Sequence, residues 1–154
     1  MSEIQNVARK FLKDEIDGIA LLKDFFDKNF SSAVNKIFKI KGKVIVTGVG
    51  KSGHIGKKIS ATLSSTGTPS YFVHPTEASH GDMGMVGNDD IIFAISWSGE
   101  TAELGDIIHF SKENKIGLIS LTSSSDSLLS QSSDIALILP CLLYTSDAAD
   151  DVTV

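Results

Sequence analysis

The sequence predicts an α/β fold: a five-stranded, mostly parallel sheet with helices on both faces, doubly wound and flavodoxin-like, preceded by N-terminal helices. From about residue 43 onward, short apolar runs alternate with stretches of helical pattern. The runs are continuously apolar, as in Ile-Ile-Phe-Ala-Ile at 91–95, and do not alternate with polar residues. Continuous runs indicate strands that are buried on both faces, which is typical of a parallel sheet between helices.

The N-terminal segment, residues 1–42, is predicted to be helical. Apolar residues recur at helical spacing from about residue 4 to 30, and Gly18 is the place where this helix would break. Ser31 or Ser32 is expected to cap a second, short helix that extends to residue 40.

The α/β core is predicted over residues 43–140. Its strands are expected at 43–47, 70–73, 90–96, 116–121 and 135–139, and its helices at 54–65, 101–113 and, briefly, 127–132. The tail, residues 141–154, has few helix or strand signals and looks unrelated to the core. In a parallel sheet the loops after the strands gather at one edge, where ligands of such folds bind.

The composition argues against several classes of function. The length of 154 residues suits one domain with a substantial core. A formal charge of -5 without a basic stripe argues against general binding of nucleic acid. The sequence has neither an apolar run long enough for a membrane span nor a secretory signal. Cys141, the single cysteine, can form no internal disulfide. We therefore expect a cytoplasmic protein without a nucleic-acid or membrane partner.

The loop after the first predicted strand has the composition of a phosphate-binding loop. Residues 47–53 read Thr-Gly-Val-Gly-Lys-Ser-Gly, directly behind Val-Ile-Val. Glycines let the backbone approach an anion, and the following helix offers unpaired N–H groups and the positive end of its dipole. Lys51 and Ser52 add a charge and a hydroxyl group at this place.

Two nucleotide-binding interpretations of this loop are weak. A P-loop would need glycine at position 45, which is Ile45. The G-x-G-x-x-G spacing at 48–53 is that of a dinucleotide fingerprint, which also needs an acidic residue at the end of the second strand. That strand is followed by His74, and the nearest carboxylate is Glu77.

Two further loops at the same edge place Ser and Thr where a helix begins, at 96–103 and 121–125. Helix capping alone can account for such residues. Three loops of this kind, one of them with Gly and Lys, favour a site for a phosphate monoester that arrives without magnesium. Glu100 and Glu103 can share one face of a first helical turn, although the helix dipole also favours acids there.

Four segments of the sequence resemble one known family. They are Gly-Val-Gly-Lys-Ser-Gly-His-Ile-Gly (48–56), Ser-Thr-Gly-Thr-Pro (65–69), His-Pro-Thr-Glu-Ala-Ser-His-Gly-Asp (74–82) and Ser-Trp-Ser-Gly-Glu-Thr-Ala-Glu (96–103). The last resembles sugar isomerase (SIS) domains in general. The first and third are similar to the arabinose-5-phosphate isomerases among them. The resemblance covers about residues 3–140.

The resemblance implies interconversion of D-arabinose 5-phosphate and D-ribulose 5-phosphate through an enediol, for which a base and stabilisation of the oxygens are required. It implies Lys51 and Glu103 as catalytic residues, with Glu103 as the base. The substrate-binding residues expected with them are Ser52, Gly67, Thr68, His80, Ser96, Ser98, Glu100, Thr101 and Thr122.

The resemblance also bears on cofactors and partners. No cofactor is required, and an inhibitory zinc ion is expected at His74, unless this histidine is a strand-end residue satisfied by the backbone. A homo-oligomer, a tetramer in the family, is implied, with a role in 3-deoxy-manno-octulosonate synthesis for lipopolysaccharide or capsule.

The match to the family stops at Pro140, whereas family members continue with a further catalytic glutamate and histidine, and many with regulatory CBS modules. We therefore expect an incomplete, C-terminally truncated form. Two alternatives remain open: a non-catalytic sugar-phosphate sensor, and an isomerase of another sugar phosphate.

Overall fold

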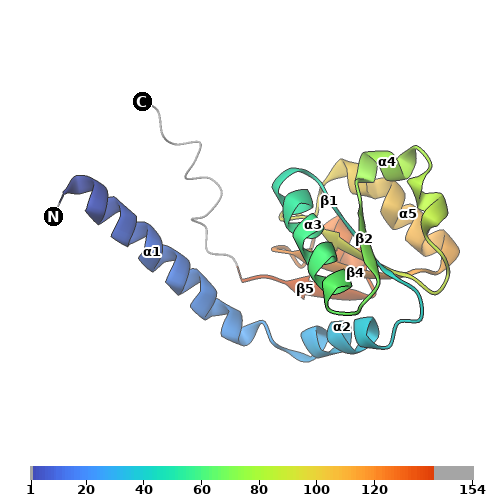
Figure 1. Ribbon diagram of the computed structural model, residues 1–154, viewed down its shortest axis with the longest axis horizontal. Helices are drawn as coiled ribbons and strands as arrows, with labels where there is room; N and C mark the ends of the chain where they lie inside the picture. The colour runs from blue at the N-terminus through green and yellow to red at the C-terminus, as the bar shows by residue number, and fades with distance from the viewer. Residues whose placement is uncertain (1, 141–154) are drawn as a thin grey trace.

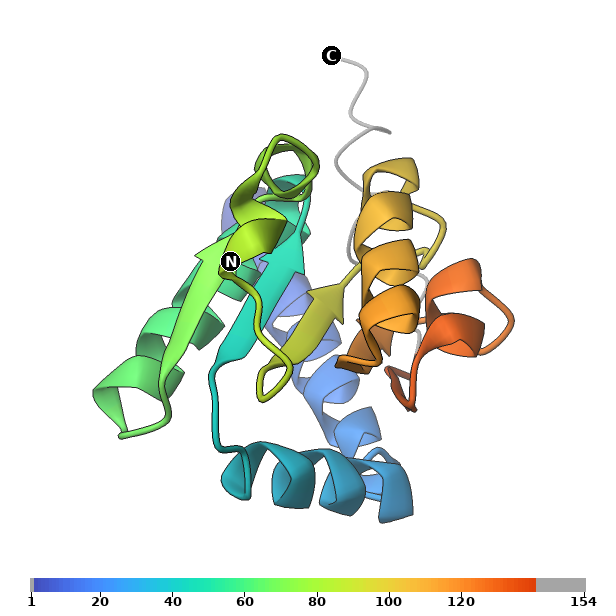
Figure 2. The same cartoon turned by 90° about the vertical axis from the view of Figure 1, so that its right-hand side faces the viewer.

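Five strands form one sheet at the centre of the structure, a computed structural model that describes residues 2–140 (Figure 1). The strands are β1 (Val44–Gly48), β2 (Ser70–Val73), β3 (Ile91–Ile95), β4 (Gly117–Thr122) and β5 (Ile135–Ile138), in the order β2-β1-β3-β4-β5. Every pairing in this sheet is parallel, and Figure 2 shows the arrows of β1, β2 and β3 pointing the same way. The predicted fold class is confirmed.

The helices of the described chain include several short ones. They are α1 (Glu3–Leu21), α2 (Lys28–Phe38), α3 (Gly50–Ser65), α4 (Pro75–Ser79), α5 (Gly105–Asn114) and α6 (Leu128–Ser132), with the 3-10 turns η1 (Leu22–Asp24), η2 (Asp82–Met85) and η3 (Ala102–Leu104). None of the helices described within residues 2–140 combines the length and the apolar character needed to cross a membrane.

Both faces of the sheet are covered. Side chains alternate along a strand, so that Ile45 and Ile92 face one side, where they pack with α4, α5 and α6. Val44 and Ile91 face the other side, where they pack with α2 and α3. This two-sided burial explains why the strand sequences are continuously apolar.

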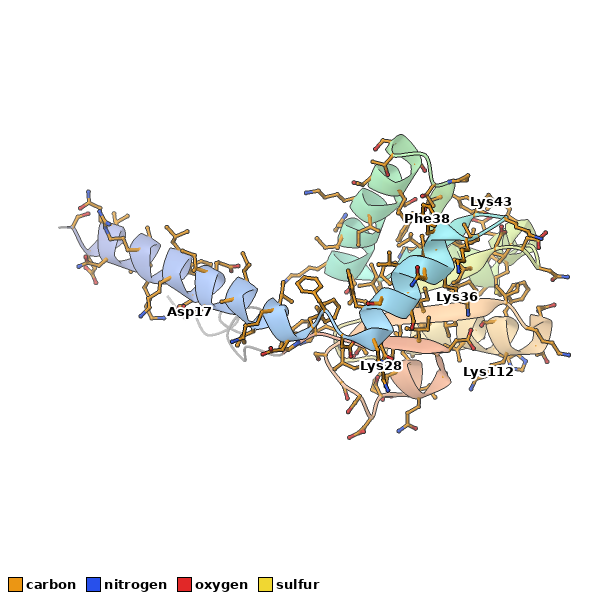
Figure 3. The ribbon with its side chains drawn as sticks, turned by 90° about the horizontal axis from the view of Figure 1, so that it is seen from below. Asp17, Lys28, Lys36, Phe38, Lys43 and Lys112 are labelled. Carbon is orange, nitrogen blue, oxygen red and sulfur yellow. The ribbon has the colours of Figure 1, made fainter. Side chains whose placement is uncertain are left out.

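α1 extends away from the sheet, and Figure 3 shows Asp17 on this extended part. It begins with a capping box formed by Ser2 and Gln5 and runs to Leu21. The predicted break at Gly18 is wrong, because one interior glycine costs a helix only about 1 kcal/mol. None of the residues of α1 is buried.

α2 is capped by Asp27, so the predicted caps Ser31 and Ser32 are wrong. The Asp27 carboxylate accepts hydrogen bonds from the N–H groups of Asn29 at 2.8 Å and Phe30 at 3.0 Å. The two serines lie inside the helix instead, where their hydroxyls donate to the carbonyl groups four residues earlier.

The core helices begin at other places than predicted. α3 starts at Gly50 rather than at residue 54, which brings Lys51 and Ser52 into its first turn. The helix predicted at 101–113 begins as η3 and becomes α-helical at Gly105. The short elements α4 and η2 were not predicted. The predicted tail, residues 141–154, lies outside the described residues.

Candidate functional site

Three loops meet at the carboxyl edge of the sheet, as predicted. β3 lies between β1 and β4, so the loops that follow these strands are neighbours. The second and third loops are also joined directly, because the N–H of Ser123 donates to the carbonyl of Trp97 at 2.9 Å. The loops thus form one continuous edge of the molecule.

The loop after β1 leaves a helix N-terminus open. Gly50 has a φ of +57°, which suits glycine, and turns the chain into α3. The N-cap residue, Val49, makes no side-chain hydrogen bond to this helix. Lys51, which is exposed, and Ser52, which is half-buried, lie in the first turn. Uncapped N–H groups, the helix dipole and a lysine together favour an anion.

Other glycines of this loop serve packing. A Cβ atom at Gly53 would lie 2.7 Å from the carbonyl oxygen of Gly48, and one at Gly56 would lie 3.0 Å from the Phe72 ring. Glycine therefore allows α3 to lie close against β1 and β2. The G-x-G-x-x-G spacing is explained by this approach and does not require a dinucleotide.

The loop after β3 uses hydroxyl groups to hold its own shape. Ser96, which is buried, shares a 2.6 Å hydrogen bond with Thr101 and accepts a 3.0 Å bond from the N–H of Gly99. Ser98 accepts a 3.2 Å bond from the N–H of Glu100, but it is exposed. Of the predicted substrate-binding serines in this loop, Ser98 is accessible and Ser96 is enclosed.

Thr122 and Glu100 tie the second and third loops together. The buried Thr122 hydroxyl donates to the carbonyl of Trp97 at 3.0 Å. The Glu100 carboxylate accepts from the N–H of Leu128, at the start of α6, at 2.8 Å. Glu100 precedes η3, so the expectation that it shares a helical turn with Glu103 is wrong. Glu103 is exposed and has no hydrogen bond or ion pair within the described chain.

Gly67 and Thr68 lie at the opposite edge of the sheet. They form the turn between α3 and β2, where Gly67 has a φ of +98°. Because β2 is parallel to β1, residues that precede it lie at the amino edge. α3 has 16 residues, so about 24 Å of helix separates them from Lys51. Within this chain the structure therefore does not bring them together with Lys51, and their role in substrate binding stays a prediction.

The two histidines of the 74–82 segment lie at opposite ends of α4. His74 caps the start of the helix, with its Nδ1 accepting from the N–H of Thr76 at 3.3 Å. His80 is the C-cap residue and is exposed, and since α4 follows β2 it belongs to the carboxyl edge. The Ser79 hydroxyl donates to Asp106 at 2.7 Å and ties α4 to α5. His80 is thus an accessible imidazole at the same edge of the sheet as the three loops.

A comparison with models of protein families shows the family of this chain. The model of the SIS domain matches residues 36–142, more than half of the chain. The chain belongs to the SIS domain family. The carboxyl-edge loops, with Lys51 in the first and Glu103 after the second, are therefore loops of a SIS domain.

The most similar SIS proteins include isomerases. Arabinose 5-phosphate isomerase KdsD of Yersinia pestis is 47% identical over 135 residues, and KdsD of Escherichia coli K12 is 44% identical over the same length. Each match covers 88% of this chain and 41% of the relative, so the chain spans less than half the length of these relatives. Among solved structures, c3406 of Escherichia coli CFT073 in complex with arabinose 5-phosphate has a TM-score of 0.79 at 38% identity, covering 92% of this chain and 77% of that one. A putative sugar-phosphate isomerase of Listeria monocytogenes has a TM-score of 0.83 at 30% identity, covering 88% and 72%.

A metal fits this SIS site poorly. Residues 2–140 contain no group of three or more His, Cys, Asp or Glu side chains that could hold a metal ion. When Nδ1 of His74 accepts from Thr76, the proton of the neutral ring lies on Nε2, and neither nitrogen is then free for a metal. Zinc at His74 would have to displace this cap, and it stays a prediction.

Sequence reasoning missed Asp106, Tyr71 and Asp90, which hold the segment around His80. Asp106 lies in the first turn of α5, where an acid is ordinarily attributed to the helix dipole. Tyr71 lies within an apolar strand, where an aromatic residue predicts only packing. Asp90 begins the third predicted strand, and a carboxylate at the start of a strand that is expected to be buried could have indicated a structural partner.

Proposed function

We propose that this chain is the SIS part of an arabinose-5-phosphate isomerase, which interconverts D-arabinose 5-phosphate and D-ribulose 5-phosphate. The observation that carries the proposal is the 44–47% identity to KdsD proteins over 88% of the chain. The geometry supports it, because an open helix N-terminus with Lys51 lies beside a loop that leads to an unpaired, exposed carboxylate, Glu103.

The phosphate group would be held by the loop after β1. Its charge is complementary to the N-terminus of α3, and the Ser52 and Ser98 hydroxyls can donate to its oxygens. Ser96, Thr101 and Thr122 support this arrangement indirectly, because their hydroxyls are bonded within the loops. The sugar then extends along the carboxyl edge toward Glu103 and His80.

The reaction needs one carbon-bound proton to be moved. The Glu103 carboxylate removes the proton from C2 of the open-chain aldose, and the electron pair forms the C1–C2 double bond of the enediol. Return of that proton to C1, with transfer of the hydroxyl proton from O2 to O1, gives the ketose. The Lys51 ammonium stabilises the negative charge that develops on the oxygens.

The direct test is an assay that couples formation of ribulose 5-phosphate from arabinose 5-phosphate to a measured signal, run beside calorimetric binding. The chain is assayed as it stands and continued by the C-terminal part of a KdsD relative, because it spans 41% of such proteins. We expect Glu103→Gln to lower turnover about a hundredfold or more. Glu113→Gln is the matched control, since it removes another exposed carboxylate, paired with His109 alone. Equal turnover in both variants would exclude Glu103 as the base, and binding without turnover in the unaltered chains would favour the sensor.

We also propose that the chain forms a homo-oligomer, a tetramer, through α1. The apolar side chains of α1 follow helical spacing and are 36–81% exposed. They are Ile4, Val7, Phe11, Leu12, Ile16, Ile19 and Leu21. A second copy that presents the same stripe can cover it. Sedimentation should show a smaller species for Phe11→Asp, whereas Asn6→Asp, on the polar face of the helix, should not change the assembly.

We propose that His74 binds an inhibitory zinc ion. We expect Zn²⁺ to inhibit by binding the His74 imidazole after displacing the Thr76 N–H. His74→Asn keeps a side-chain oxygen that can cap α4 but removes the imidazole. Inhibition by zinc should therefore be lost in His74→Asn, and undiminished inhibition would exclude His74 as the ligand.

We propose a cytoplasmic location and a role in making lipopolysaccharide or capsule precursors. The support is the kinship to the KdsD proteins and to a solved protein of Bacteroides fragilis, 33% identical, described as a putative phosphosugar isomerase involved in capsule formation. Deleting the gene should lower the precursor pool, and supplied arabinose 5-phosphate should restore it.

A further inference from the structure

The segment of residues 80–90 connects α4 to β3 and carries His80 at its start. It runs from the carboxyl edge of the sheet to the amino edge, and most of its residues are exposed. Its one regular element is the short η2, and Gly81 has a φ of +130°. A segment with so little structure of its own keeps one position only where other parts of the chain hold it.

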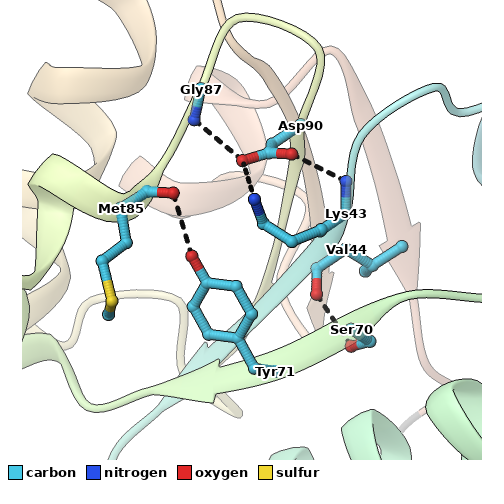
Figure 4. A network of polar contacts seen from close by, with 7 residues as sticks. All are labelled: Lys43, Val44, Ser70, Tyr71, Met85, Gly87 and Asp90. Carbon is cyan, nitrogen blue, oxygen red and sulfur yellow. Dashed lines mark hydrogen bonds and ion pairs between the residues drawn. The ribbon is translucent and has the colours of Figure 1, made fainter.

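Asp90 holds the amino-edge end of the 80–90 segment (Figure 4). Its side chain is 3% exposed. One carboxylate oxygen accepts from the N–H of Lys43 at 2.7 Å, and the other accepts from the N–H of Gly87 at 2.8 Å. The Lys43 ammonium lies 3.5 Å from the second oxygen. These charge-assisted bonds fix the end of the segment to the start of β1.

Tyr71 holds the middle of the segment. Its hydroxyl reaches out from β2 and donates to the carbonyl of Met85 at 3.0 Å (Figure 4). Met85 ends η2, whose beginning is closed by a 2.9 Å bond from the N–H of Gly84 to the carbonyl of Gly81. Since Gly81 follows His80 directly, one short helical turn connects the Tyr71 hydroxyl to the backbone of His80.

We propose that Tyr71 is a positioning residue for His80, and that the two together act on the sugar end of a bound sugar phosphate and not on its phosphate group. This inference rests on the proposed function. The phosphate end belongs to Ser52 and the open N-terminus of α3, which the hydrogen bond from Tyr71 to Met85 does not touch. Loss of the hydroxyl therefore weakens recognition of the sugar and leaves phosphate binding unchanged.

The test removes the Tyr71 hydroxyl alone, by Tyr71→Phe. Ser70→Ala is the matched control, because it removes a hydroxyl group from the neighbouring residue of β2. That hydroxyl bonds the carbonyl of Val44 at 2.7 Å and the Ser60 hydroxyl at 3.1 Å, and neither partner belongs to the 80–90 segment. Calorimetry measures affinity for arabinose 5-phosphate and for inorganic phosphate, and mass spectrometry measures amide hydrogen exchange of residues 80–90.

We expect Tyr71→Phe to lower the affinity for arabinose 5-phosphate about three- to tenfold, the size of one neutral hydrogen bond. Affinity for inorganic phosphate should not change, and amide exchange of residues 80–90 should become faster. Ser70→Ala should change none of the three. A general loss of stability would lower both affinities together, and that result would overturn the proposal.

A double-mutant cycle with His80→Ala separates a positioning role from a direct contact. If Tyr71 acts through His80, Tyr71→Phe lowers the affinity no further once His80 is replaced. A full Tyr71→Phe effect without His80 would overturn the proposal. An unaltered chain that does not bind arabinose 5-phosphate contradicts the proposed function instead. The exchange measurement still decides on Tyr71 in that case, and unchanged exchange in Tyr71→Phe overturns its role.

Discussion

The loops after β1 and β3 lie side by side at the carboxyl edge, yet they use their polar groups in opposite ways. The first leaves Lys51 exposed and the N-terminus of α3 without a side-chain cap. The second bonds Ser96 to Thr101 and sends Glu100 to the start of α6. A binding edge thus consists of groups left free and of a scaffold that holds them, and both are made from the same residue types.

The largest effect is expected from Gly53→Ala, which forces α3 away from β1. The added Cβ would lie 2.7 Å from the Gly48 carbonyl oxygen, a backbone atom that cannot move aside. We expect the free energy of unfolding to fall by about 3 kcal/mol in urea denaturation. Gly50→Ala is the matched control, because that position is open and costs only left-handed strain of about 1 kcal/mol. If both variants lose the same free energy of unfolding, close packing of α3 against β1 is not the reason for glycine at position 53.

Lys51→Met tests whether the first loop consists of free groups. Methionine keeps much of the length but loses the charge, so affinity for arabinose 5-phosphate should fall about 10- to 100-fold, while the urea midpoint stays unchanged. Lys58→Met, on the same face of α3 two turns later, should bind as the unaltered chain does. An unchanged affinity in Lys51→Met would remove Lys51 from the site.

The second loop should show the reverse pattern. Ser96→Ala leaves the N–H of Gly99 and the Thr101 hydroxyl without their partner, so the free energy of unfolding should fall by about 1–3 kcal/mol. Ser98→Ala should change stability by less than about 0.5 kcal/mol but lower sugar-phosphate affinity several-fold. Calorimetry and urea denaturation of both variants are the measurements. If Ser96→Ala affects binding alone, the contrast between scaffold and binding serines is wrong.

Features that depend on local pattern could be predicted from the sequence. The apolar run at 91–95 predicts a strand because both of its faces are covered, and five such runs separated by helices predict the parallel sheet. The meeting of three loops at one edge follows from that topology. Lys51 and Ser52 could be placed at the start of the helix that follows the first strand for the same reason.

Features that depend on a choice between partners could not be predicted. Asp27 and Ser31 are both good N-caps, and the carboxylate that accepts from two N–H groups prevails. Glu100 carries no sign that it pairs with Leu128, 28 residues later. Thr68 looks like another hydroxyl residue for phosphate, but the length of α3 carries it to the far edge. A hydroxyl or carboxylate can serve a ligand or the fold, and only the folded geometry decides.

The smallest effect on stability is expected at Tyr71. Its hydroxyl, like those of Ser96 and Thr122 in the second and third loops, bonds to another part of the chain. Burial, and then the charges of Asp90 and Asp82, raise its pKa above the ordinary value near 10. The folded chain therefore keeps this proton to higher pH than the unfolded chain. Its contribution to stability is complete below pH 10 or so and is lost as the pH rises through the raised pKa.

Urea denaturation of the unaltered chain and of Tyr71→Phe between neutral pH and about pH 11 isolates this contribution, because lysines that titrate in the same range are common to both. The free energy of unfolding of the unaltered chain should fall more steeply above about pH 10 than that of Tyr71→Phe. The two curves should run parallel below that pH. If they also run parallel above it, burial and the charges of Asp90 and Asp82 do not raise the pKa of Tyr71 in the folded chain, and the hydroxyl is not enclosed in the fold as the contrast between free and scaffold groups requires.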